Sequence, residues 1–87
     1  MLKYAVGDVV AKRNGAGFWG IIVSIYDIGT IQGKAPSWRY DVMAIRKEFF
    51  GTVHIMSTEQ IHPCSIEVDD PDYPVLIDIQ RRMGLAV

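Results

Sequence analysis

The chain has 87 residues, of which 49% are hydrophobic and 22% are charged, and its formal net charge is −1. This length fits one domain with a small core, and the composition is that of a folded globule rather than a disordered tail. A chain of this length has no room for a catalytic cleft between two lobes, so an active site would need more than one copy. The small net charge argues against nucleic-acid binding.

The single cysteine, Cys64, excludes an intramolecular disulfide. It favours a reducing, cytoplasmic setting in which Cys64 is an inert core thiol. No pair of cysteine and histidine has the spacing of a zinc site, so we expect no bound metal. The N-terminus lacks the apolar segment of a signal peptide, and no apolar run approaches the length of a membrane span. We therefore expect no membrane partner.

Five segments combine alternating or β-branched side chains with flanking turn residues, which is the pattern of β-strands. They span residues 8–13, 18–28, 38–45, 52–56 and 61–63. The connections are a tight reversal at 14–17, a loop at 29–37, a hairpin connection at 46–51 and one helical turn at 57–60. Gly20 predicts a bulge or a close approach of another backbone. Together they predict a mostly β fold, a small SH3-like barrel of about five antiparallel strands with a short C-terminal helix.

Residues 67–87 have a different character from the barrel, which we assign to residues 1–66. An acidic linker precedes a helix that begins near Tyr73, with Asp72 as N-cap, Pro74 in the first turn and Gly84 as the stop. One face of this helix is apolar, formed by Val75, Leu76, Ile79 and Met83. Asp78 and Arg82 lie four residues apart on the other side. We expect the helix to pack on its own barrel or on a neighbouring subunit.

The strand at 52–56 carries the most informative side chains. Because side chains alternate along a strand, Val53 and Ile55 share one face, and His54 and Met56 share the other. We expect Val53 and Ile55 to face the core and the other two to face outward. His54 is then a base, a ligand or an ordinary surface residue, and composition alone favours the last.

No catalytic residue can be assigned from motifs. No serine lies in a nucleophile-elbow context, and the Gly-Ala-Gly of residues 15–17 lacks the ending of a phosphate-binding loop. The acidic residues Asp69, Asp70 and Asp72 could bind a hard cation, although a solvated linker is the simpler interpretation. The adjacent Phe49 and Phe50 indicate either an interface or an apolar cap on the barrel.

Two stretches resemble the type II dihydrofolate reductases, a plasmid- and integron-borne family. The family pattern Gly-Asp-x-Val-x-Lys, then Gly-Ala, then Gly-x-Ile-Val-x-x-Tyr is matched without a gap within residues 6–26. The matching residues are Gly7, Asp8, Val10, Lys12, Gly15, Ala16, Gly20, Ile22, Val23 and Tyr26. Residues 51–56 are similar to Gly-Ser-Val-Gln-Ile-Tyr, the strand that lines the family's active-site pore. The resemblance covers most of residues 6–63.

The resemblance implies an NADPH-dependent reductase of dihydrofolate, associated with trimethoprim resistance, that works as a homotetramer around one pore. Catalysis would rest on orienting cofactor and substrate in a dry pore, with no dedicated general acid. Lys12 would be the cation near the pore mouth, attracting the cofactor phosphate and the glutamate tail of the substrate. The site would be formed by Lys12, Val53, His54, Ile55 and Met56. Subunit interfaces would include Phe18, Trp19 and Thr52.

The chain also departs from the family pattern. His54 replaces the pore glutamine and can still donate and accept hydrogen bonds when neutral. Met56 replaces the pore tyrosine, and Phe18 replaces an interface tryptophan. The tail after Pro63 has no counterpart in the short family members and could alter or block the tetramer.

The same fold allows a second interpretation, because small barrels serve unrelated functions. The chain would then be a non-catalytic binding module, from an integron cassette or a phage. It would bind a partner through Trp19, Trp38, Phe49 and Phe50.

Overall fold

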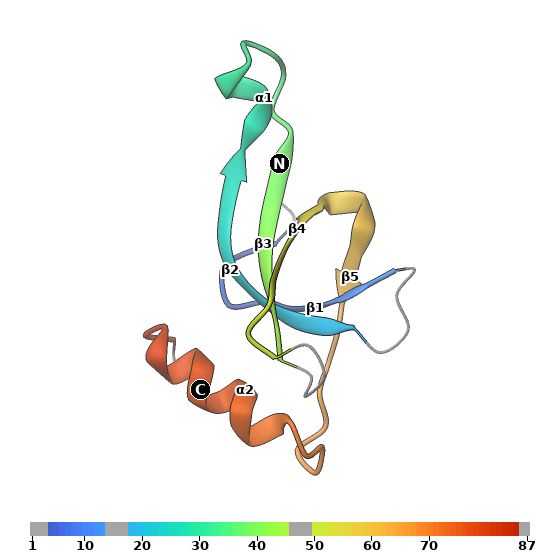
Figure 1. The fold of residues 1–87 in the computed structure, drawn as a ribbon, viewed down its shortest axis with the longest axis vertical. Coiled ribbons are helices and arrows are strands. Elements are labelled where there is room, and N and C mark those ends of the chain that lie inside the picture. Colours follow the sequence, from blue (N-terminus) through green and yellow to red (C-terminus); the bar gives the residue numbers. More distant parts are fainter. Residues whose placement is uncertain (1–3, 14–17, 46–49, 86–87) are drawn as a thin grey trace.

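The structure is a computed structural model that describes residues 4–13, 18–45 and 50–85 (Figure 1). The elements in chain order are β1 (Val9–Lys12), β2 (Trp19–Asp27), α1 (Ile28–Ile31), β3 (Trp38–Ala44), β4 (Val53–Ser57), η1 (Thr58–Gln60), β5 (Ile61–Pro63) and α2 (Tyr73–Arg82). The strands form one antiparallel sheet in the order β4-β3-β2-β1-β5. The predicted mostly β fold, with five antiparallel strands and a short C-terminal helix, is confirmed.

The sheet is curved and open. Figure 1 shows β1 and the start of β2 crossing near the lower ends of β3 and β4, with β5 to the right of β4. The single 3₁₀ turn η1 connects β4 to β5, the two edges of the sheet. The sheet curls as an SH3-like barrel does, but no ladder joins β4 to β5 in the described part of the chain.

Gly20 lies on β2 close to the backbone of β3. A side chain there would collide with the backbone carbonyl of Met43, so the predicted close approach is confirmed. The bulge is elsewhere, because the register with β3 shifts between Ile22 and Ser24 and leaves Val23 as the extra residue. A bulge bends its strand and increases the local twist, which helps the sheet to curl.

Apolar layers cover both faces of the sheet. The inner layer consists of Tyr4, Val10, Phe18, Ile22, Tyr40, Val42, Ala44, Met56 and Ile61. The outer layer contains Trp19, Ile21, Ile45 and Leu76 as its buried members. The predicted apolar face of α2 packs here through Val75, Leu76, Ile79 and Met83. The helix therefore docks on the sheet of its own chain.

The ends of α2 match the prediction in position but not in every contact. Asp72 is at the N-cap, but its backbone is helical (φ −89°, ψ −5°) and its side chain makes no capping bond. A capping side chain usually needs extended backbone, so Asp70 bonds instead, its carboxylate accepting from the Asp72 amide at 2.8 Å. Gly84 follows the helix end with φ 80°, and the predicted pair of Arg82 with Asp78 is present at 3.0 Å.

The predicted loop at residues 29–37 begins instead with the helical turn α1. The Asp27 carboxylate accepts hydrogen bonds from the backbone amides of Gly29 at 2.9 Å, Thr30 at 3.3 Å and Ser37 at 2.7 Å. It also accepts from the Thr30 hydroxyl. That hydroxyl and the Ser37 amide are the main causes that lower the pKa of Asp27. An aspartate at a strand end is a capping signal, which strand patterning alone overlooked.

Two predicted connections cannot be compared with the structure. The reversal at 14–17 and residues 46–49, including Phe49, lie outside the described residues. Among the described helices, none is both long and apolar enough to cross a membrane.

We predict that Asp27→Asn loosens the β2–β3 connection without unfolding the sheet, because a neutral amide is a weaker acceptor for four donors. Acidification should act in the same way on the unchanged chain. The pKa of Asp27 is lowered by folding, so its stabilisation is present above the unfolded value of about 3.9 and is lost as the pH falls through the lower folded value. At a fixed pH, amide hydrogen exchange in the variant should accelerate at Gly29, Thr30 and Ser37 but not at Val42. On acidification of the unchanged chain, the protection of the same three amides relative to their intrinsic exchange rates should fall. Unchanged exchange at all three amides would contradict this role.

Candidate functional site

The two faces of β4 are the reverse of the sequence prediction. His54 lies opposite Val42 on β3, and Met56 lies opposite Tyr40. Opposite residues of an antiparallel pair share a face, and Val42 and Tyr40 are fully buried. Met56 is therefore a core residue, with only 4% exposure. The outward orientation predicted for it is wrong, and its side chain is not accessible to a ligand in the single chain.

The face predicted to be in the core is the exposed one. Val53 is 54% exposed and Ile55 is 66% exposed. The physical reason for the error is that β4 carries apolar side chains on both faces. Alternation then identifies two faces but cannot say which one β3 brings against the core.

The same two residues also direct their backbone groups outward. In the described part of the chain, β4 is an edge strand with β3 as its single neighbour. The Ala44 amide donates to the Thr52 carbonyl at 2.9 Å, so the even-numbered residues of β4 bond toward β3. The backbone N–H and C=O groups of Val53 and Ile55 therefore point away from the sheet. We call these two residues the β4 edge. Such an edge is suited to pairing with another chain.

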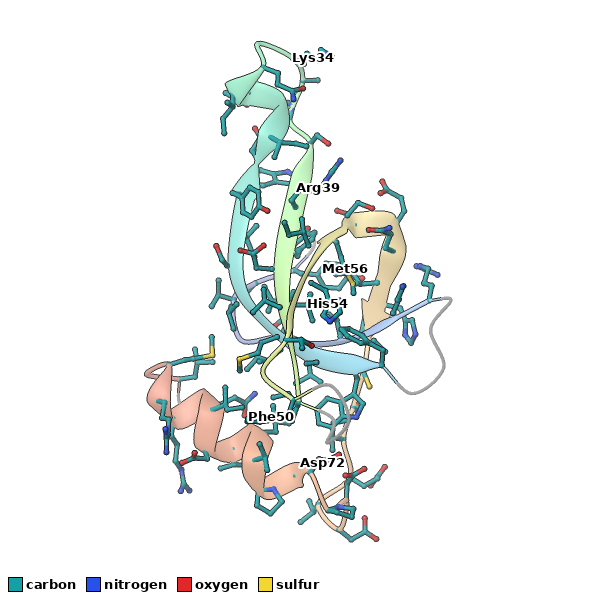
Figure 2. All side chains as sticks on the ribbon, viewed as in Figure 1. Lys34, Arg39, Phe50, His54, Met56 and Asp72 are labelled. Atoms are coloured by element: carbon teal, nitrogen blue, oxygen red, sulfur yellow. The ribbon has the colours of Figure 1, made fainter. Side chains whose placement is uncertain are left out.

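His54 is half-buried on the inner face, between an aromatic ring and a hydroxyl. Its imidazole packs edge-on against the Phe18 ring, with centroids 4.7 Å apart at 79°. Its Nε2 lies 2.9 Å from the Thr52 hydroxyl. Figure 2 shows His54 and Met56 inside the curve of the sheet, between β4 and β5. The structure thus brings together three residues that the resemblance assigns to the pore or to interfaces.

Lys12 lies beside the same group. Its backbone amide donates to the Phe18 carbonyl at 3.4 Å, and its side chain is exposed at the end of β1. Alternation from the buried Val10 places Lys12 on the inner side of the sheet, the side of His54. Lys12 forms no ion pair with a described residue. We call Lys12, Phe18, Thr52 and His54 the β4 corner.

Trp19 is covered by the C-terminal helix. It is 5% exposed and packs in the outer layer with Leu76. The tail after Pro63 thus covers the surface that Trp19 would offer to another subunit. The expected place of Trp19 at an open subunit interface is therefore wrong. Trp38 is half-buried against the inner core. Of the aromatic residues expected to contact a partner, Phe50 is well exposed, at 55%.

An apolar groove lies between Phe50 and α2. Ile45, Phe50, Asp72 and Val75 line a pocket of about 420 Å³, a volume within the range of small-ligand sites. Figure 2 shows Phe50 and Asp72 on the α2 side of the sheet. The groove could accept an apolar side chain, with one carboxylate at its border.

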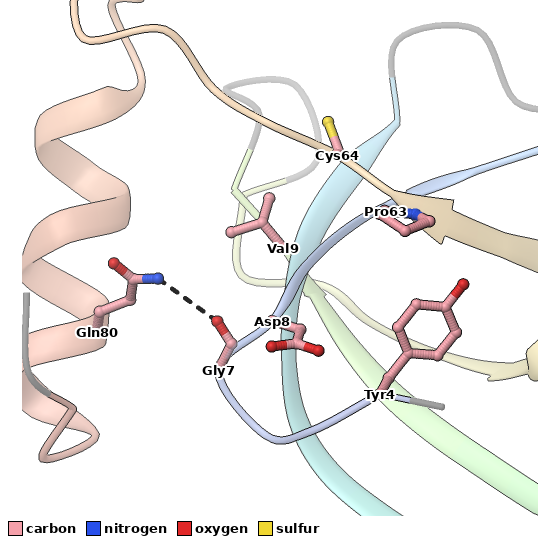
Figure 3. A pocket seen from close by; sticks show the side chains of 7 residues that line it. All are labelled: Tyr4, Gly7, Asp8, Val9, Pro63, Cys64 and Gln80. Atoms are coloured by element: carbon pink, nitrogen blue, oxygen red, sulfur yellow. Dashed lines mark hydrogen bonds between the residues drawn. The ribbon is translucent and has the colours of Figure 1, made fainter. Parts of the chain in front are cut away.

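A second pocket, of about 440 Å³, lies where α2 meets the turn before β1 (Figure 3). Its polar groups mostly hold that turn. The Gln80 side-chain amide donates to the Gly7 carbonyl at 3.4 Å, and the Asp8 carboxylate accepts from the Ala5 amide at 3.0 Å. Burial raises the pKa of the Cys64 thiol that borders the pocket. Because the thiolate is the reactive form, Cys64 is a poor nucleophile here.

Among the described residues, no three histidine, cysteine or acidic side chains gather closely enough to hold a metal ion. A polar pocket that sequence reasoning missed lies around Arg39, which is half-buried. It joins residues 36–39 to residues 57–59. The two walls of this pocket lie about twenty residues apart along the chain. A single arginine in a strand pattern therefore gave no sign that a pocket would form around it.

No protein-family model and no curated protein matches this chain. The functional assignment therefore depends on the residues and geometry described above. They comprise an exposed apolar β4 edge and a β4 corner with an imidazole and a lysine. Three residues that the resemblance would place at the pore or at an interface are instead buried: Phe18, Trp19 and Met56.

We predict a large loss of stability for a substitution at Met56 and almost none for a substitution at its neighbour Ile55. Met56→Ala should lower the free energy of unfolding by about 2–5 kcal/mol, because it leaves a cavity in the core. Ile55→Ala should change it by less than about 0.5 kcal/mol in the single chain, because this side chain is exposed. Urea unfolding at low protein concentration measures both values. If Ile55→Ala lowered the free energy of unfolding more than Met56→Ala did, the orientation predicted from the sequence would be right and the one in the structure wrong.

Proposed function

We propose that the chain is an NADPH-dependent reductase similar to the type II dihydrofolate reductases, binding the cofactor and a pterin-like substrate in a site shared between subunits. The observation that carries the proposal is the exposed β4 edge, where Val53 and Ile55 combine apolar side chains with outward backbone groups. Folded proteins usually cover or block such an edge. This edge also belongs to the strand that resembles the family's pore wall.

A shared site would supply what one chain lacks. None of the three pockets described above is lined by residues 53–56. A symmetric oligomer would repeat the β4 edge and the β4 corner around an axis. Flat rings could then lie between apolar edges from different subunits.

Each residue of the site has a role that follows from its chemistry. The exposed Lys12, repeated in every subunit, would attract the cofactor phosphate and the acidic tail of the substrate. Val53 and Ile55 would offer apolar surface and backbone hydrogen-bonding groups to the rings. His54, held by Phe18 and Thr52, can donate and accept as the family's glutamine does.

The chemistry of the reaction would come from the bound cofactor, which supplies the hydride. The chain would contribute orientation and exclusion of water rather than an acid or a base. This division of work fits a site in which no general acid is assigned.

A non-catalytic interaction module is the second candidate. The apolar groove beside Phe50 favours it, because Phe50 is 55% exposed and the groove is lined by Ile45 and Val75. An apolar side chain of a protein partner would fit there. This alternative requires neither a shared pore nor cofactor binding.

The assembly can be tested with a matched pair of substitutions. We expect a homotetramer by multi-angle light scattering at micromolar concentration. Ile55→Asp should reduce the mass toward that of the monomer, because it places a charge at every β4 edge. Ile31→Asp is the control, since Ile31 is 81% exposed on α1 and should leave the mass unchanged. A monomeric wild-type chain would rule out the shared site.

Cofactor binding and turnover form the second test. We expect NADPH oxidation in the presence of dihydrofolate, followed by absorbance, and NADPH binding by calorimetry. Lys12→Met should weaken NADPH binding about tenfold at low salt, and the difference should shrink as salt screens the charge. Lys34→Met is the control, because Lys34 lies at the far end of the β2–β3 hairpin (Figure 2). If the tetramer neither binds NADPH nor oxidises it, the reductase proposal is wrong and the interaction module remains as the candidate function.

A further inference from the structure

A polar pocket lies where β4 ends and the chain turns into η1. The last residue of β4, Ser57, pairs with Arg39. The segment before Arg39 therefore has no strand beside it on this side within the described residues. Residues 36–39 and 57–59 line a pocket of about 310 Å³ here. It shares no residue with the β4 edge or the β4 corner.

Arg39 is a half-buried cation fixed at the wall of this pocket. Its Nη1 donates to the Ser37 hydroxyl and to the Trp38 carbonyl, each at 3.0 Å. Both acceptors are neutral, and no described carboxylate forms an ion pair with Arg39. The other guanidinium N–H groups keep their capacity to donate. A partly buried charge of this kind is stabilised by an anion that accepts those hydrogen bonds.

Two further donors lie on the same wall. The Ser37 hydroxyl accepts from Arg39, so its own hydrogen remains available to a ligand. The Ile28 amide donates to the Ser37 carbonyl at 3.0 Å, so the backbone groups of Ser37 point toward β2. Backbone groups of successive residues in a strand point to opposite sides. The backbone amide of Trp38 therefore faces the side where β4 has ended. The wall is therefore rich in donors.

Glu59 is the acidic residue among those that line the pocket, and it is exposed. Its pKa is lowered, first by its own backbone amide, then by the Ser57 hydroxyl, with a smaller effect of the Arg39 charge. It is thus ionised at neutral pH and repels an anion. Removing its charge should therefore strengthen anion binding, whereas removing the charge of Arg39 should weaken it.

We propose that this pocket binds the phosphate group of a small phosphate-bearing molecule, such as a mononucleotide or a sugar phosphate. The phosphate oxygens accept from the Arg39 guanidinium, the Ser37 hydroxyl and the Trp38 amide. Three donors suit the three free oxygens of a phosphate ester better than the two of a carboxylate. The volume is at the lower end of ligand pockets, which fits a mononucleotide better than a dinucleotide. The site is complete in one chain and does not depend on the reductase proposal.

The test is an NMR titration of amide shifts at low salt, with AMP, inorganic phosphate and adenosine as the probes. AMP and phosphate should shift the amides of residues 37–39 in a saturable way, and adenosine should not. Stronger binding of AMP than of phosphate indicates an ester as the ligand, and equal binding indicates free phosphate. Saturable binding of adenosine at these amides, or no saturable binding of either phosphate probe, would overturn the proposal.

Three variants sharpen the result. Arg39→Gln should weaken AMP binding about tenfold, since a hydrogen bond to a charged group is lost. Arg81→Gln removes the same charge from an exposed position on α2 and should leave binding unchanged. Glu59→Gln, at an exposed residue of η1, should tighten binding about threefold, because it removes the repelling charge. Weaker binding by Glu59→Gln, or unchanged binding by a folded Arg39→Gln, sinks the proposal.

Discussion

The pairing of β4 with β3 is the constraint on which the rest of this structure depends. With Val42 opposite His54 and Tyr40 opposite Met56, one face of β4 completes the inner core and the other is left in solvent. A slip of one residue would exchange the two faces. It would bury Val53 and Ile55 and expose Met56, and it would separate His54 from Phe18. Both the core and the candidate site therefore follow from a single register.

The C-terminal helix sets how much of the outer face remains open. A small chain buries a limited share of its surface, and here α2 provides a second apolar layer over Trp19 and Ile21. The helix does not cover Val53 and Ile55, which stay exposed. The chain thus covers one part of its outer face by itself and leaves the β4 edge exposed. The proposed assembly through β4 fits this arrangement, whereas an assembly that needs an accessible Trp19 does not.

The two proposed sites differ in what they require. The β4 edge and corner offer apolar surface, one imidazole and one lysine, and under the reductase proposal they would become a site when several chains meet. The Arg39 pocket is formed by residues of one chain, with a cation held by two neutral acceptors. The first would bind flat rings between subunits, whereas the second would bind a compact anion. Their independence means that the assembly state bears on one and not on the other.

The sequence by itself determined the strands, the helical turn before β5 and the apolar stripe of α2, because these depend on local periodicity and turn chemistry. The resemblance assigned Lys12 and His54 to ligand binding and Phe18 and Thr52 to interfaces, and in the structure these four residues lie close together. Tertiary structure decided which face of β4 is buried, since both faces are apolar and the choice is made by pairing with β3. It also decided that Asp27, besides capping α1, accepts from the Ser37 amide at the other end of the β2–β3 connection, and that Arg39 faces a pocket built from two distant segments. Contacts of this kind join residues far apart in the chain, so patterns among neighbouring residues do not predict them.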